Sequence, residues 1–99
     1  MEPFERFKKT NTEGNLWIYV MSLGKNEEVC DDEVAKIIFE KFGFLPDSIL
    51  LSTVLYRLRR QGFIQTEKLK GKKAYSTTEA GKKELEKMME FSADILQKI

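Results

Sequence analysis

The feature that most constrains the fold is a change of periodicity between residues 46 and 78. Apolar residues first recur at helical spacing from Pro46 to Gln61, and Gly62 then ends the pattern. Alternating apolar and polar residues follow in two short runs, which predict two strands. A basic segment centred on Gly71 separates them and predicts a turn. The strand runs are Phe63–Glu67 and Ala74–Thr77, and the turn is Lys68–Lys73.

Positive charge is concentrated in the same stretch. Between Leu55 and Tyr75, seven basic residues stand against one glutamate, which gives a local net charge of +6. Because the whole chain carries only +1, the remaining residues sum to −5. Such a local excess indicates a surface that binds phosphate groups. The basic residues are Arg57, Arg59, Arg60, Lys68, Lys70, Lys72 and Lys73.

Composition narrows the class of protein. A chain of 99 residues suits one small domain with a modest core. No apolar run approaches the roughly 20 residues of a membrane span, and the N-terminus lacks the apolar core of a signal peptide, so we expect no membrane association and a cytoplasmic location. With no histidine and a single cysteine, Cys30, we expect no metal site, no cofactor and no enzymatic activity.

Three further helices are predicted ahead of this stretch. Residues 2–9 form a short helix, and a buried helix spans Leu16–Leu23, with Thr12 as its cap and Gly24 as its end, although β-branched residues leave a strand open there. Asp31 or Asp32 caps the next helix, which Gly43 ends; its core-facing residues are Val34, Ile37, Ile38 and Phe42.

A short turn, Phe44-Leu45, then leads from that helix to the basic helix, as a helix-turn-helix requires. With the hairpin that follows, the order predicts a winged helix-turn-helix, an α+β fold that is mostly α with a two-stranded wing. We expect one domain over residues 1–99, with a winged-helix core at 10–78 and a C-terminal dimerisation helix at 79–99.

The basic helix should turn Leu51, Val54, Leu55 and Leu58 toward the core and its remaining side chains toward DNA. Polar and basic groups there suit phosphates and base edges, and an apolar residue near the helix start suits a thymine methyl, unless it packs against Phe44. The wing lysines suit the DNA backbone; the alternative is a solvated hairpin whose lysines prevent edge pairing. The predicted DNA-binding residues are Ser48, Leu50 (with Ile49 as a further candidate), Ser52, Thr53, Tyr56, Arg57, Arg60, Lys70, Lys72 and Lys73.

The last helix carries an apolar stripe that one protomer offers little to cover. A symmetric pairing of such helices, joined by the N-terminal aromatic residues, predicts a homodimer, whereas folding back over its own domain is the alternative. Two recognition helices related by a dyad would read a pseudo-palindromic operator in double-stranded DNA. The predicted interface residues are Phe4, Phe7, Leu85, Met88, Met89, Ser92, Ile95, Leu96 and Ile99.

Two segments resemble a known family. The segment Leu55–Ile64 resembles the end of the recognition helix and the first wing strand of winged-helix regulators, and Tyr75–Gly81 is similar to the passage that closes the wing in the PadR family, with MarR-like proteins as close relatives. The resemblance spans about residues 13–99. It implies a homodimeric DNA-binding transcriptional regulator, usually a repressor, that pairs through its terminal helices.

Three alternatives stay open from the sequence. A winged-helix module for protein interaction would use the Met88 and Met89 stripe to bind a partner rather than DNA. Cys30 is interpreted as structural rather than as a redox switch, because Asp31 and Asp32 oppose thiolate formation. Trp17 and Tyr19 either pack in the core or line a pocket for an aromatic effector, and the sequence identifies no effector.

Overall fold

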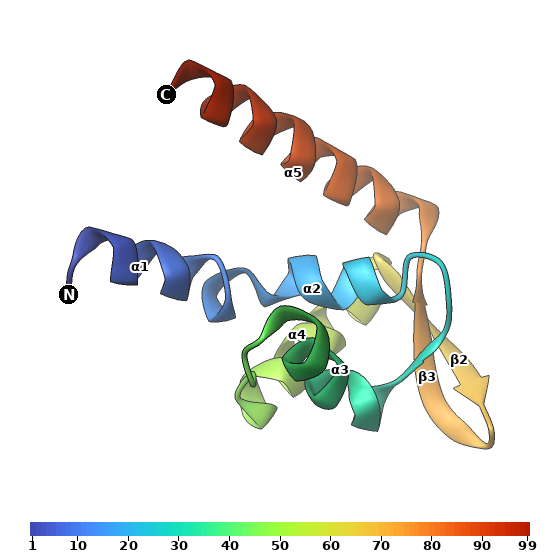
Figure 1. Cartoon of the computed structure of the whole chain (residues 1–99). Coiled ribbons are helices and arrows are strands. Elements are labelled where there is room, and N and C mark those ends of the chain that lie inside the picture. Colours follow the sequence, from blue (N-terminus) through green and yellow to red (C-terminus); the bar gives the residue numbers. More distant parts are fainter.

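The computed structural model describes residues 1–99 and confirms a mostly helical winged helix-turn-helix (Figure 1). Five α-helices and two short 3₁₀ turns (η) accompany a small antiparallel sheet, whose β2–β3 hairpin projects from one end of the helical body (Figure 1). None of the helices combines the length and apolar composition needed to cross a bilayer. In chain order the elements are α1 (Pro3–Thr10), η1 (Glu13–Asn15), α2 (Leu16–Leu23), β1 (Val29–Cys30), η2 (Asp31–Glu33), α3 (Val34–Phe42), α4 (Ser48–Gln61), β2 (Ile64–Leu69), β3 (Lys72–Thr77) and α5 (Glu79–Lys98).

The wing is a regular hairpin of β2 and β3, paired from Ile64 opposite Thr77 to Leu69 opposite Lys72. Lys70 and Gly71 alone connect the strands, and both have positive φ, 53° and 77°. Two successive left-handed residues make the turn whose twist matches that of the flanking strands. The strands are therefore longer, and the turn shorter, than the sequence indicated.

A third strand, β1, was not predicted. It pairs with the outer side of β3, with Val29 opposite Tyr75 and Cys30 opposite Ala74, so the strand order is β1-β3-β2. A strand of two residues is too short to show alternation of apolar and polar side chains. This pairing of β1 with β3 joins the wing to the rest of the domain along one edge of β3.

The helix-turn-helix is formed by α3 and α4. Gly43, at the end of α3, and Gly62, at the end of α4, both adopt left-handed φ values, 83° and 81°. The Asp47 carboxylate accepts a hydrogen bond from the Leu50 amide at 2.9 Å and caps α4, which begins two residues later than predicted.

Two predicted caps are wrong. The Thr12 hydroxyl donates back to the carbonyl oxygen of Lys8 at 2.8 Å, and η1 intervenes before α2. Asp31 and Asp32 lie in η2, and α3 begins without a side-chain cap. Both carboxylates instead face basic side chains, as described below.

The core lies between α2, α4 and the sheet. Tyr75 of β3 is fully buried, and its hydroxyl donates to the Val20 carbonyl oxygen at 2.7 Å. Beside it, the Thr77 hydroxyl donates to the Met21 carbonyl oxygen at 2.7 Å. These two bonds attach the end of α2 to the base of the wing. The main core residues are Leu16, Val20, Met21, Val34, Ile38, Leu51, Leu55, Leu58, Ile64, Tyr75 and Leu85.

The two terminal helices extend beyond this body on one side and diverge (Figure 1). No residue of α1 is buried. The first turns of α5 pack on the domain, where Gly81 and Leu85 are buried, and the helix then continues into solvent to Lys98.

Candidate nucleic-acid interface

The recognition helix α4 presents one outer stripe to solvent. Because side chains 3 or 4 residues apart share a helix face, Ile49, Thr53, Tyr56 and Arg60 form a continuous line opposite the buried leucines. The exposed fraction is 78% for Ile49 and 62% for Tyr56. We call these four residues the outer stripe.

Beside the outer stripe lies a concave site between α4 and the wing, which we call the helix–wing cavity. Its volume is about 500 Å³. It brings together four of the predicted DNA-binding residues, Ser48, Ser52 and Tyr56 from the helix and Lys73 from the wing. The other lining residues are Asp31, Asp32, Ala35, Leu51, Leu55 and Arg59.

Strand alternation adds a basic residue, Lys68, that was not among the predicted DNA-binding residues. Lys68 lies directly opposite Lys73 in the hairpin, so both side chains stand on one face of the wing. Thr66 is two residues before Lys68 and shares that face, and its hydroxyl accepts a hydrogen bond from Arg59 of α4. The face that carries Lys68 and Lys73 is therefore the one joined to the recognition helix.

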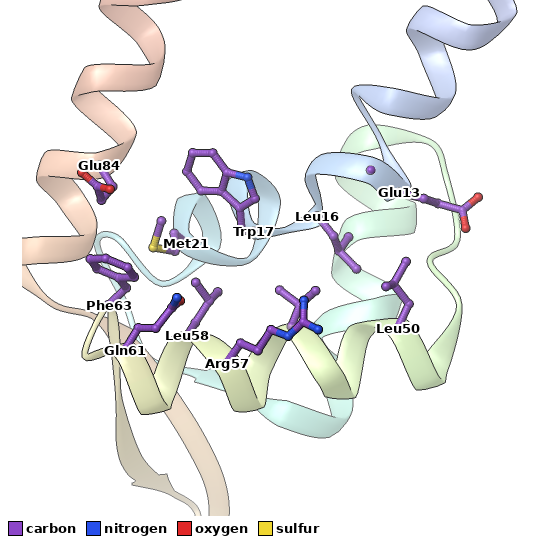
Figure 2. A pocket seen from close by; sticks show the side chains of 12 residues that line it. Glu13, Leu16, Trp17, Met21, Leu50, Arg57, Leu58, Gln61, Phe63 and Glu84 are labelled. Atoms are coloured by element: carbon purple, nitrogen blue, oxygen red, sulfur yellow. The ribbon is translucent and has the colours of Figure 1, made fainter.

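Leu50 and Arg57 lie on the other flank of α4, away from the helix–wing cavity. Leu50 is half-buried against the core, and both residues line a second cavity of about 410 Å³ between α2, α4 and α5 (Figure 2). Figure 2 shows the Arg57 side chain running along α4 on this side, below Leu16. This placement contradicts Leu50 as an outward-facing reader near the helix start, where Ile49 is exposed instead.

The reason is the helical angle. Residues 50 and 57 are seven apart and fall in one row, about 100° from residue 49 along the helix surface. From periodicity alone, the boundary between the core face and the solvent face passes through this row. Whether residues 50 and 57 face the core or solvent depends on the position of α5, which closes the far end of the second cavity with Glu84.

The two acids of the helix–wing cavity are paired with bases. Arg59 donates to both oxygens of Asp31, at 2.7 and 2.8 Å, and only 15% of the Arg59 side chain is exposed. Lys72 approaches Asp32 at 3.4 Å, and both of these side chains are 61% exposed. The count of seven basic residues therefore overstates the cations that are free for phosphate. The exposed ones without an ion pair are Arg60, Lys68, Lys70 and Lys73, together with Arg57 on the other flank of α4.

Two side chains have a shifted pKa, Cys30 and Tyr75, and both are buried in the interior. Burial of Cys30 in β1, and then the carboxylates of Glu33 and Asp32, raise the pKa of its thiol. Burial likewise raises the pKa of the Tyr75 phenol. A thiol that keeps its proton is a poor nucleophile, so Cys30 acts as a core residue.

The other aromatic residues separate into two environments. Tyr19 packs edge-on against Phe42 and Phe44, and its hydroxyl donates to the Asn11 carbonyl oxygen. Trp17 is half-buried and lines the second cavity, opposite α4 (Figure 2). Tyr19 is therefore partly buried and packs against the core, while Trp17 forms a cavity wall.

The residues predicted for a dimer interface fall into three groups. Leu85 is buried within its own protomer, and Met88 and Ser92 are half-buried there. Phe4 and Phe7 of α1 stack on each other, with exposed fractions of 66% and 61%. The remaining predicted residues of α5, Met89, Ile95, Leu96 and Ile99, are exposed, as is Phe91, which was not among the predicted residues.

The fold of this chain is similar to that of several solved structures. A PadR-like transcription factor from Bacteroides fragilis matches with a TM-score of 0.76 at 17% sequence identity, over 94% of each chain. A PadR family transcription regulator from Clostridium difficile matches with a TM-score of 0.72 at 23% identity, over 83% of this chain and 91% of that one. The chain has the winged-helix fold of PadR-like transcription regulators.

The PadR-like fold also matches Bacillus subtilis PadR, solved in complex with operator DNA, with a TM-score of 0.67 at 23% identity. That match covers 76% of this chain but only 46% of the Bacillus protein, so the chain spans about half of that protein's length. No protein-family model matches the sequence, and a search of curated proteins finds no match.

Proposed function

We propose that this PadR-like chain is a homodimeric transcriptional regulator that binds double-stranded DNA sequence-specifically and represses by occupying a pseudo-palindromic operator. The observation that carries the proposal is the helix–wing cavity. It puts polar side chains of the recognition helix and a lysine of the wing on one concave surface. A duplex can contact both at once only if they face the same side of the molecule.

In this proposal, residues of the outer stripe and of the helix–wing cavity make different contacts with DNA. Ser48, Ser52, Thr53 and Tyr56 supply hydrogen bonds to base edges in the major groove, and Ile49 offers a methyl contact to thymine. Arg60 and the free wing lysines contact the phosphate backbone. Lys72 also contacts the backbone when a phosphate takes the place of Asp32. The Lys72–Asp32 ion pair is easily exchanged because it is a single contact between two exposed side chains.

The proposed dimer rests on the exposed apolar surface of the terminal helices. Leu96 is 71% exposed and Ile99 is 94% exposed, and Phe91 and the two α1 phenylalanines add large apolar area. A second copy of α5, lying between α1 and α5, would bury these side chains and place two recognition helices in one particle. Leu85 contributes through its own protomer's core and does not reach the partner.

Titration of a labelled duplex by fluorescence anisotropy, at two salt concentrations, tests the DNA proposal. Binding should weaken by nearly one log unit per neutralised phosphate for each tenfold rise in salt. Lys73→Ala and Arg60→Ala should lower the affinity for random and selected duplexes alike, by about tenfold each at 0.1 M salt. Lys87→Ala, on α5 and away from the site, is the charge-matched control.

The outcome that overturns the proposal is binding that is absent or insensitive to salt, which would favour a protein-interaction module. Equal affinity of the Lys73 and Lys87 variants would remove the wing from the interface. Selection of bound fragments from random DNA would then test sequence preference and whether the preferred site is symmetric.

Sedimentation equilibrium tests the dimer with two variants from one turn of α5. Ile95→Asp places a charge on the apolar face, whereas Gln97→Asp places the same charge on the opposite, solvated side. The first should sediment as a monomer at concentrations where the parent and the second sediment as dimers. Identical behaviour of both variants would contradict an interface built from α5.

A further inference from the structure

The side chain of Arg59 makes the most extensive set of polar contacts in the molecule. Its Nε donates to the Thr66 hydroxyl at 3.0 Å, and Nη1 and Nη2 donate to the two oxygens of Asp31. Nη2 also donates to the carbonyl oxygen of Ala74 at 3.0 Å. Four of the five hydrogens of a guanidinium thus reach protein acceptors in a rigid planar fork.

These contacts join four separate segments. Arg59 belongs to the last turn of α4, Thr66 to β2 and Ala74 to β3, while Asp31 follows β1 directly. The backbone supplies a different connection, because α4 continues into β2 through Gly62, which adopts a left-handed conformation. Arg59 therefore connects the recognition helix directly to both strands of the wing and to Asp31.

Arg59 also lines the helix–wing cavity beside Ser52, Tyr56 and Lys73. Resting on the proposed DNA binding, we propose that Arg59 is a positioning residue for recognition, with Asp31 as its anchor. It holds the wing at the separation from α4 at which Lys73 and the recognition helix contact one duplex together. It does not act as a phosphate-binding cation, because its charge and donors are already committed.

The neighbouring acid provides a contrast within the same short turn. Asp31 is 24% exposed and bidentate to Arg59, whereas Asp32 is 61% exposed and bonded once to Lys72. A partly buried bidentate pair is costly to break, while a solvated single contact contributes little. Loss of either carboxylate removes one negative charge from the same cavity, but only loss of Asp31 releases Arg59.

The matched pair Asp31→Asn and Asp32→Asn tests the proposal by the sign of the change in DNA affinity. If Arg59 were a masked phosphate ligand, both variants would bind DNA more tightly than the parent. As a positioning residue, Arg59 predicts tighter binding for Asp32→Asn and weaker binding for Asp31→Asn. We expect about tenfold weakening and a salt dependence that is shallower by about one phosphate for the second variant.

Hydrogen exchange of the wing amides gives a readout that needs no DNA. Asp31→Asn should speed exchange across β2 and β3, and Asp32→Asn should leave it unchanged. Thr66→Val, which removes one of the four bonds and keeps the charge, serves if Asp31→Asn is too unstable to purify. It should weaken DNA binding and speed exchange in the same direction, to a smaller extent.

Failure of this inference is distinguishable from failure of the proposed function. A parent protein that binds no duplex refutes the DNA-binding function, while the exchange data still decide whether Arg59 fixes the wing. A parent that binds DNA, together with an Asp31→Asn variant that binds as tightly as Asp32→Asn, refutes the positioning role of Arg59.

Discussion

Replacement of Gly81 by alanine should destabilise the domain, although a change from glycine to alanine usually stabilises a helix. Gly81 lies in the first turn of α5 and is buried. An added Cβ would lie 2.2 Å from the carbonyl oxygen of Phe63 and 2.7 Å from the methyl group of Thr77. The oxygen belongs to the backbone that joins α4 to the wing, and the Thr78 amide already bonds to it. Neither the oxygen nor the helix can therefore move alone.

The magnitude follows from two opposed effects. Alanine in place of glycine favours a helix by about 0.8–1 kcal/mol. Overpacking of a closely packed site costs about 1–3 kcal/mol, and a contact this short with backbone lies toward the upper end. We expect the free energy of unfolding to fall by about 1–2 kcal/mol, which lowers the melting temperature by roughly 5–15 °C in a domain of this size.

Urea unfolding followed by circular dichroism measures this change, with Gly14→Ala as the control. The nearest atom to a Cβ at Gly14 is the Lys9 carbonyl oxygen at 3.5 Å, an ordinary contact, so that variant should keep the parent's midpoint. A Gly81→Ala variant as stable as the Gly14 variant would show that α5 can shift off the base of the wing, and the reasoning would fail.

Three further predictions concern the interior. Tyr75→Phe leaves the Val20 carbonyl oxygen without its hydroxyl donor, and should lower the free energy of unfolding by about 1–2 kcal/mol, measured in the same urea titration; an unchanged midpoint would contradict a stabilising bond. Cys30 should react with iodoacetamide more slowly in the folded protein than in urea, because burial raises its pKa. The folded thiol holds its proton to higher pH than the unfolded thiol, so the stability due to Cys30 is complete below about pH 8. It is lost as pH rises above the ordinary thiol pKa of about 9 and through the raised pKa of the folded thiol. Cys30→Ala should remove that decline, and a decline that persists would implicate another group.

The sequence was sufficient for the recognition helix and the wing because local chemistry defines their ends. Gly62 ends α4 as predicted, and the turn of the hairpin lies inside the predicted basic segment, although the Asp47 cap and the two-residue length of the turn were not predicted. Each signal lies within four residues of the element that it limits. That is why the winged-helix fold could be predicted from one chain.

The misses have a common cause in distance along the chain. Asp31 and Arg59 are 28 residues apart, so no local pattern marks Asp31 as an anchor rather than a cap. The flank occupied by Leu50 depends on where α2 and α5 pack, and Val29–Cys30 becomes a strand only because β3 offers an edge. Charge counting failed in the same way, since it registers cations without their partners.

The attachment of α5 has a consequence for the spacing of the half-sites in the proposed operator. The arm that would join two protomers starts one residue after β3, where Thr78 caps it and also bonds to Gly62. No flexible linker separates the start of α5 from the rest of the domain. The distance and rotation between the recognition helices of a dimer would therefore be fixed by a rigid connection. One inserted base pair rotates a half-site by about 35° relative to its mate. A connection of this kind would reject such an operator, whereas a regulator on a loose linker would adapt to it.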